Sequence, residues 1–109
     1  MMTDRKMPIP KQFKILAHQI TVKYEQKECD LQTLQGAANF NYNRITLLDH
    51  EALGHPRTHT ETTFVEETLH HIGRILDIDW LKGLDDDENH KQVGRLAEAL
   101  VQVFHTAEF

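Results

Sequence analysis

The spacing of the apolar residues changes near Glu61, and this change restricts what the chain can fold into. Before Glu61, the segments "FKILAHQITVKYE" and "GAANFNYNRITLLD" contain β-branched and aromatic residues among polar ones, which predicts short strands or hairpins around residues 13–24 and 38–48. After Glu61, apolar residues recur every three or four positions, which predicts helices over about 61–78 and 87–106. Strands followed by two packed helices predict an α+β domain, with a small antiparallel or mixed sheet packed on two main helices.

The two predicted helices each carry one apolar face. On the first helix this face consists of Val65, Leu69, Ile72 and Leu76, and on the second of Val93, Ala97, Leu100, Val101 and Phe104. Between them, "DWLKGLDDDEN" contains a glycine and consecutive aspartates, which favour a turn and the negative first turn of the second helix. Residues 49–62 show no clear period and predict a loop, in which Thr60 or Thr62 offers a hydroxyl N-cap to the first helix.

Length and composition indicate one small soluble domain spanning residues 1–109, with 39% hydrophobic and 27% charged residues. The formal net charge of −5 argues against direct nucleic-acid binding, which requires a basic surface. No apolar run reaches the roughly 18 residues of a membrane helix, and "MMTDRKMPIPKQF" lacks the apolar stretch of a signal peptide. Because Cys29 is the only cysteine, no disulfide can form within the chain, and we expect a cytoplasmic protein without membrane contact.

The stretch "EETLHH" places two carboxylates and two imidazoles within six residues of the first predicted helix. Glu66 and His70 lie four residues apart, so both project from one side of the helix, at the flank of its apolar face. A carboxylate and an imidazole one turn apart can bind one metal ion, because both can place a ligand atom about 2 Å from a common point. Such pairs are also common on solvated helices, and Glu67 and His71 repeat the spacing. A third ligand must decide between the two interpretations.

His90 is the candidate third ligand. At about 100° per residue it shares a helix face with Val93, Ala97 and Phe104, so we expect it to face the first helix. Glu88 points away from this face and is expected to be solvated. A histidine in this position could instead be a buried side chain that bonds to a single carbonyl group.

The segments "TFVEETLHHI" and "DENHKQVGRLAEALVQVF" together resemble the small zincin-like proteins of phages and prophages, which are related to the ImmA/IrrE-type metallopeptidases. That family carries "TFxHExxHxI" on its first helix and, on a later helix, an acidic residue three before a Val, followed by "LAxxLxQVL". The segments "PKQFKILAHQITV" and "GAANFNYNRITLL" resemble its opening hairpin and a following strand, so the resemblance extends over nearly the whole chain. It implies a single zincin-like domain that binds one Zn²⁺ ion and hydrolyses peptide bonds.

The chain differs from the family pattern at two positions. Glu66 stands where the family has the first His of HExxH, and His90 stands where it has the downstream acidic ligand. Together these differences exchange a His for a carboxylate and a carboxylate for a His, and zinc accepts the two imidazoles and one carboxylate that remain. The resemblance therefore implies Glu66, His70 and His90 as metal ligands and Glu67 as the general base, which takes a proton from water.

Other residues near this site have open roles. His71 is expected to be exposed rather than to contact the ligands. His55 and His59 closely precede the first helix and could line a cleft or complete a ligand set, although loop histidines are usually solvated. Tyr24 or Tyr42 could stabilise an oxyanion.

Two alternatives to a metallopeptidase remain open. The first is a catalytically inactive zincin-fold module that binds a protein partner through the cleft, since a carboxylate ligand makes the ion less acidic. The second is a structural ion that only joins the two helices. A shift of one or two residues in the alignment would also make Asp87 or Glu88 the third ligand. The sequence indicates a protein or peptide as substrate or partner and leaves the oligomeric state open.

Overall fold

The computed structural model describes residues 6–25, 36–39, 43–82 and 87–108. In chain order the elements are β1 (Gln12–Ile15), β2 (His18–Tyr24), β3 (Gly36–Asn39), β4 (Arg44–Leu47), the 3₁₀ helix η2 (Glu51–Leu53), α2 (Arg57–Leu76), α3 (Asp79–Lys82) and α4 (Asp87–Thr106). The α+β class is confirmed, with strands in both predicted regions and two long helices after them. Cys29 and Tyr42 lie outside the described residues.

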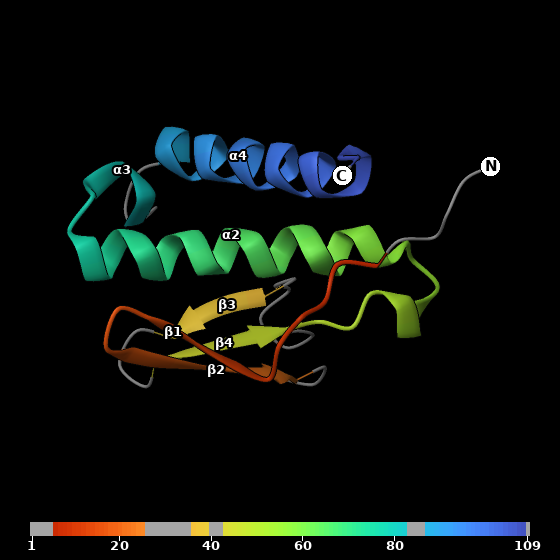
Figure 1. Cartoon of the computed structure of the whole chain (residues 1–109), viewed down its shortest axis with the longest axis horizontal. Helices are drawn as coiled ribbons and strands as arrows, with labels where there is room; N and C mark the ends of the chain where they lie inside the picture. Colours follow the sequence, from red (N-terminus) through yellow and green to blue (C-terminus); the bar gives the residue numbers. More distant parts are fainter. Residues whose placement is uncertain (1–5, 26–35, 40–42, 83–86, 109) are drawn as a thin grey trace.

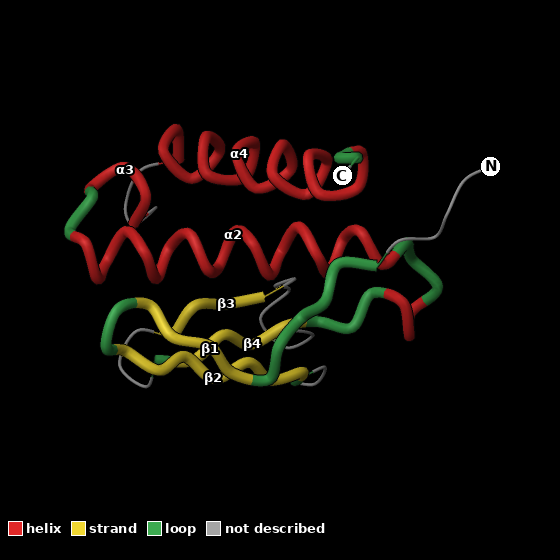
Figure 2. Tube along the Cα trace, viewed as in Figure 1, coloured by secondary structure: helices red, strands yellow, loops and turns green. Residues whose placement is uncertain are grey.

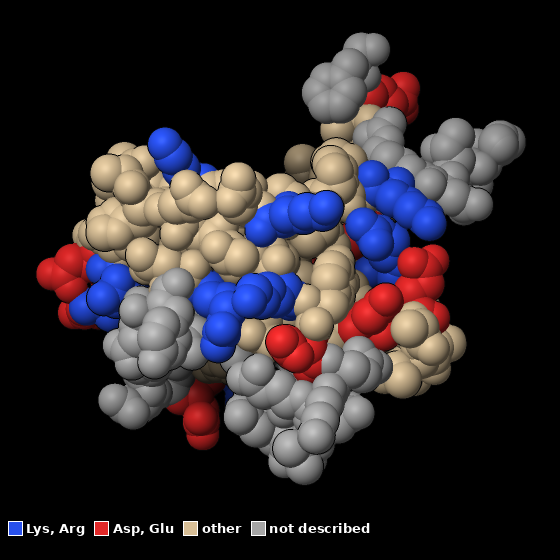
Figure 3. Space-filling view, turned by 90° about the horizontal axis from the view of Figure 1, so that it is seen from below, with Lys and Arg blue, Asp and Glu red and all other residues tan. Residues whose placement is uncertain are grey.

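The four strands form one mixed sheet in the order β1-β2-β4-β3. β1 and β2 form an antiparallel hairpin, β3 pairs antiparallel with β4, and β2 and β4 run parallel. Successive residues point to opposite faces, so one face is apolar and packs on α2; its residues are Phe13, Ile15, Ile20, Val22, Ile45 and Leu47. Figure 3 views the molecule from the sheet side and shows lysine and arginine side chains across the middle of this surface, with acidic side chains mostly nearer its rim.

α2 lies between the sheet and α4, so the fold has three layers (Figure 1 and Figure 2). A helix covered on two sides buries side chains beyond a single apolar stripe, and the buried residues of α2 include Glu61, Glu67, His70 and His71. The expectation that His71 is exposed is therefore wrong. His71 is fully buried, and its Nε2–H donates to the carbonyl oxygen of Arg44 in β4 at 3.0 Å.

α2 begins four residues earlier than the apolar spacing predicts, directly after Pro56. A proline suits this boundary, because the first residues of a helix have no intrahelical partner for their N–H groups. Thr60 and Thr62 lie inside the helix, so the predicted hydroxyl cap is wrong. The Thr60 hydroxyl instead accepts a hydrogen bond from the backbone N–H of His50 (3.0 Å) and donates to the carbonyl of Leu48 (3.3 Å), which ties the chain leaving β4 to α2.

Two residues of the predicted apolar faces are exposed: Leu76 by 48% and Leu100 by 44%. Leu76 is the last residue of α2, where packing ends. α4 packs on one side only (Figure 1), so a narrower stripe of Val93, Ala97 and Val101 is buried. Within the described ranges, the helices are too short or too polar to cross a membrane.

The connection between the long helices contains α3, where the sequence predicts only a turn. Asp77 ends α2 with a left-handed φ of 57°, and α3 then folds back against the last turns of α2. Gly73 permits this contact, because a Cβ there would lie 2.6 Å from the backbone carbonyl carbon of Leu81, closer than packed atoms approach. Leu81 is buried, so α3 closes this end of the core.

The other end of α2 is held by the carboxylate of Glu61, which is 1% exposed. One of its oxygens accepts hydrogen bonds from the backbone N–H of Met7 (3.0 Å) and the side chain of Arg57 (3.2 Å), and the other pairs with His105 of α4. Glu61 at one end and α3 at the other therefore set the spacing of the two long helices.

Candidate metal centre

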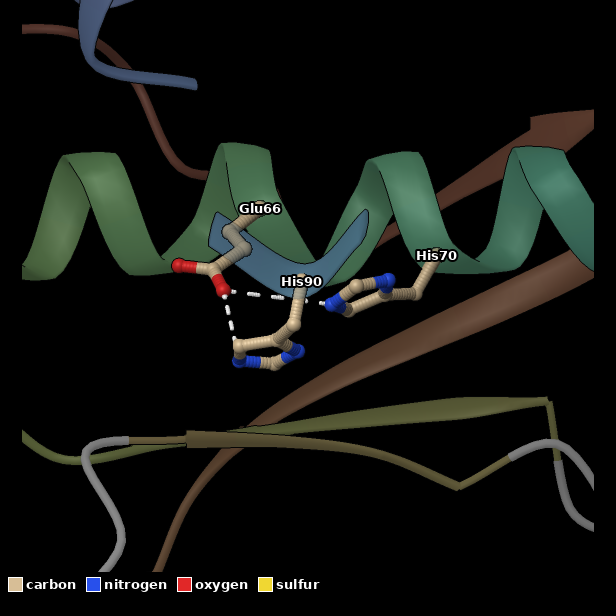
Figure 4. Close-up of side chains that lie close together, drawn as sticks. All are labelled: Glu66, His70 and His90. Atoms are coloured by element: carbon tan, nitrogen blue, oxygen red, sulfur yellow. Dashed lines mark ion pairs between the residues drawn. The ribbon is translucent and has the colours of Figure 1, made fainter. Parts of the chain in front are cut away.

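The three predicted ligands come together between the long helices: Glu66 and His70 extend from α2, and His90 extends from α4 (Figure 4). Glu66 Oε2 lies 3.2 Å from His90 Nε2 and 3.9 Å from His70 Nε2, and the three ligand atoms lie within 4.8 Å of one another. The prediction that His90 faces the first helix is confirmed. Asp87 and Glu88 are exposed and do not belong to this group.

These separations fit one metal ion after a small contraction. Ligand atoms bound to tetrahedral zinc lie roughly 3.3–3.4 Å apart, given metal–ligand distances of about 2.0–2.1 Å. The Glu66–His90 pair is already close to this spacing at 3.2 Å, the Glu66–His70 pair exceeds it slightly at 3.9 Å, and all three ligand atoms lie within 4.8 Å of one another, so the two histidines must approach each other most. The rings of His70 and His90 stack with centroids 5.2 Å apart and planes 18° from parallel. The His90 side chain is 55% exposed, so its ring can turn toward a shared ion.

The contact between His70 and α3 prepares this histidine for coordination. Its Nδ1 lies 2.9 Å from the carbonyl oxygen of Leu81, which can only accept, so Nδ1 carries the proton. The lone pair of Nε2 is then directed toward Glu66 and His90, and this buried atom has no hydrogen-bond partner among the described residues. Metal-binding histidines usually donate their second N–H to such an acceptor, which fixes tautomer and ring orientation.

The local electrostatics favour a positive charge at this point. Burial disfavours the imidazolium form of His70, but the Glu66 carboxylate, the Leu81 carbonyl and the Glu67 carboxylate outweigh burial and raise the pKa of His70. A proton and a metal ion would compete for the same nitrogen of His70. The group Glu66, His70 and His90 could thus hold a metal ion.

Glu67, the predicted general base, follows Glu66 directly but is turned by about 100° around the helix. It lies on the side of α2 that also carries His71, which contacts β4. Glu67 is 8% exposed, and its charge contributes to the raised pKa of His70. The predicted base is therefore beside the ligands but mostly covered.

A cavity of about 360 Å³ opens between α2 and α4 next to Glu66, and we call it the α2–α4 groove. Its lining residues are Thr58, His59, Thr62, Thr63, Glu66, Gly94 and Glu98. A Cβ at Gly94 would lie at an ordinary packing distance of 3.8 Å from Glu66 Oε1, which places one carboxylate oxygen at the wall of the groove. The groove therefore borders the candidate centre at Glu66, whereas His70 and His90 are not among its lining residues.

The remaining predicted residues fall in different places. His59 lines the α2–α4 groove and His55 is exposed, but neither belongs to the Glu66 group. Tyr24 interacts with Arg57 in the first turn of α2, while burial raises its pKa. That turn lies about 13 Å along the helix from Glu66 at 1.5 Å per residue, so Tyr24 does not border the candidate centre.

Two features of the centre are not predicted from the sequence: the Leu81 carbonyl that orients His70, and the close packing of α3 that places it there. The available signal is Gly73, three residues after His70. A glycine inside a helix lowers its stability and often marks a place where another backbone approaches closely.

Comparisons with protein-family models, with curated proteins and with solved structures give no match for this chain. Function must therefore be inferred from the geometry of the site itself.

Proposed function

We propose that this protein is a zinc-dependent hydrolase of peptide bonds, with Glu66, His70 and His90 as zinc ligands and Glu67 as the general base. The observation that carries the proposal is the buried Nε2 of His70, which the Leu81 carbonyl directs toward the other two ligands. Catalytic zinc sites have three protein ligands and one open position, and imidazole and carboxylate are both zinc ligands. The resemblance to small zincin-like proteins supports the same assignment.

Glu66, His70 and His90 would hold a Zn²⁺ ion, which would supply Lewis acidity and make water easier to deprotonate. Glu67 would accept a proton from the water that attacks the peptide carbonyl, the role that the resemblance assigns to this position. The α2–α4 groove provides space for a peptide segment, and the threonines of its wall offer hydroxyl groups that can bond to peptide N–H and carbonyl groups.

The burial of Glu67 favours a second candidate, a metal-holding module that binds a protein segment without cleaving it. A general base must come within hydrogen-bond reach of the water that it deprotonates, and Glu67 is only 8% exposed. In this candidate the ion joins α2 to α4, and the α2–α4 groove binds the partner.

Metal content and hydrolysis of untagged protein distinguish the two candidates. His70→Ala should abolish tight zinc binding at this centre, because only two ligands remain. Glu67→Gln should keep the ion, because it preserves the shape and all three ligands, but peptide hydrolysis should disappear. Zinc retention without hydrolysis in the wild type would support the second candidate. If Glu67→Gln loses the ion as readily as His70→Ala, Glu67 is a ligand and the roles assigned here are wrong.

The pH dependence of zinc binding gives an independent test. Because the pKa of His70 is raised, protons should begin to displace zinc above the ordinary histidine value of about 6.5, and the apparent affinity should fall further in acid. Competition with a chelator of known affinity at several pH values measures this. An affinity that does not change between about pH 8 and 6 would exclude imidazole ligands.

A further inference from the structure

A second group of imidazoles lies where the chain passes from the sheet to α2. His50 follows β4, His55 follows the 3₁₀ helix η2, and His59 lies in the first turn of α2. The ring centroids of His50 and His59 are 5.3 Å apart, those of His50 and His55 are 5.9 Å apart, and those of His55 and His59 are 6.1 Å apart. The backbone brings them together, because the N–H of His55 donates to the carbonyl of His50 at 2.9 Å.

His50 is the unusual member of this group. It is 4% exposed, and neither of its ring nitrogens has a hydrogen-bond partner among the described residues. A neutral imidazole has one donor and one acceptor nitrogen, and leaving both unsatisfied in the interior costs free energy. Its backbone is held by the Thr60 hydroxyl, so the ring is positioned by the fold. Burial and the neighbouring imidazoles of His59 and His55 lower the pKa of His50, which favours the neutral, metal-binding form.

The ring centroids are spaced nearly as in a three-histidine metal site, although the ring nitrogens in their present orientation do not form a close ligand group like that of Glu66, His70 and His90. Zinc–nitrogen distances of about 2.0–2.1 Å place the ring centroids of tetrahedral ligands roughly 5.2 Å apart. The His50–His59 pair has this separation, and the other two pairs exceed it by less than about 1 Å. His55 and His59 are exposed, so their rings can turn toward a common ion while buried His50 stays in place.

We propose that His50, His55 and His59 form a second metal site, which binds a first-row transition ion such as Zn²⁺ through three imidazoles. Imidazole is a preferred ligand of zinc, copper and nickel. The site does not depend on the function proposed for the first centre. His59 and Glu66 both line the α2–α4 groove, but seven residues of helix separate them, about 10 Å, whereas ions that act on one bond lie about 3.5–4 Å apart. The second ion would therefore bind at the other end of the groove.

Zinc stoichiometry tests this proposal. Untagged wild-type protein, dialysed against buffered Zn²⁺ and analysed for bound metal, should hold two ions. The double variant H55Q/H59Q should hold one ion, and it should remain folded because both side chains are exposed. H70A should also hold one ion, and the combined triple variant should hold none. H18Q, which changes an exposed histidine on β2, is the matched control and should keep two ions.

Histidine ring NMR identifies the nitrogens involved. The ring signals of His50 should shift on zinc addition in H70A and should not shift in H55Q/H59Q. A wild-type protein that holds one ion and loses it in H70A overturns the second site, as does an H55Q/H59Q variant that still holds two. One ion that is lost in H55Q/H59Q but kept in H70A supports the second site and refutes the first.

Discussion

Gly73→Ala should weaken zinc binding without touching any zinc ligand. The new Cβ would lie 2.6 Å from both the carbonyl carbon and the Cβ of Leu81 and 2.7 Å from the backbone nitrogen of Lys82. Ordinary packing contacts begin near 3.4 Å, so the backbone of α3 must move away from α2. The hydrogen bond from His70 to the Leu81 carbonyl, now 2.9 Å, would then lengthen or break.

The size of each effect can be worked out separately. Overpacking a tight contact lowers the free energy of unfolding by about 1–3 kcal/mol. Replacing glycine inside a helix by alanine raises it by about 1 kcal/mol, because alanine has the higher helix propensity. The free energy of unfolding of the metal-free G73A variant should therefore fall by up to about 2 kcal/mol. Loss of the group that orients a metal-binding histidine typically lowers metal affinity 10–100-fold, and we expect a reduction in that range.

Two control variants separate orientation from stability. Gly94→Ala introduces a Cβ at an ordinary distance of 3.8 Å from Glu66, so it should stabilise α4 by about 0.5–1 kcal/mol and leave the zinc affinity unchanged. Ile20→Val, in the core of the sheet, should cost about 0.5–1.5 kcal/mol with the same zinc affinity as wild type. Urea unfolding and chelator competition measure the two quantities. If G73A binds zinc as tightly as wild type, the Leu81 carbonyl does not orient His70 and the reasoning fails.

Three further predictions concern charge. Exchanging the ligands by E66H/H90E in the H55Q/H59Q background should retain one zinc ion, because the set of two imidazoles and one carboxylate is unchanged; metal analysis that shows no zinc would refute the assignment of His90. Burial lowers the pKa of His71 in the folded protein. On acidification, the His71 imidazole is therefore protonated in the unfolded chain, near pH 6.5, before it is protonated in the folded protein. The free energy of unfolding of wild type relative to H71Q should therefore fall below about pH 6.5, as urea titrations of metal-free protein can show. Glu61→Ala removes a buried carboxylate with three hydrogen-bond partners and should cost on the order of 2–4 kcal/mol in the same assay, whereas a cost below about 1 kcal/mol would contradict its role as a tertiary anchor.

The elements that the sequence predicts well are those with strong local periodicity. The body of α2 and the whole of α4 follow from apolar residues at helical spacing. The direction of His90 toward α2 could also be predicted, because His90 shares a helix face with Val93 and Ala97. The first turn of α2 could not be predicted in this way. It is held by contacts between distant segments, such as those of Thr60 with Leu48 and of Glu61 with Met7.

The errors at the site have a common physical origin. A helical projection treats a helix as having one buried face and one solvated face, but α2 is covered by α4 on one side and by the sheet on the other (Figure 1). His71 is therefore buried against β4, although it lies well round the helix from the ligands. The parallel pairing of β2 with β4 and the return of α3 onto Gly73 are likewise contacts between segments that no local pattern encodes.

The packing of α4 on α2 brings one carboxylate and two imidazoles together at the candidate metal centre. Glu66 is the middle member of the group: its Oε2 lies near the imidazoles of both His70 and His90, while its Oε1 lies at the wall of the α2–α4 groove beside Gly94. The Glu66 carboxylate favours the protonated form of the neighbouring His70 imidazole. A metal ion bound as proposed would replace a proton on His70 and would require little movement of α2, because the Leu81 carbonyl already holds His70 in place. The half-exposed His90 would then be the ligand that moves most on binding, and through it metal binding would be coupled to the position of α4.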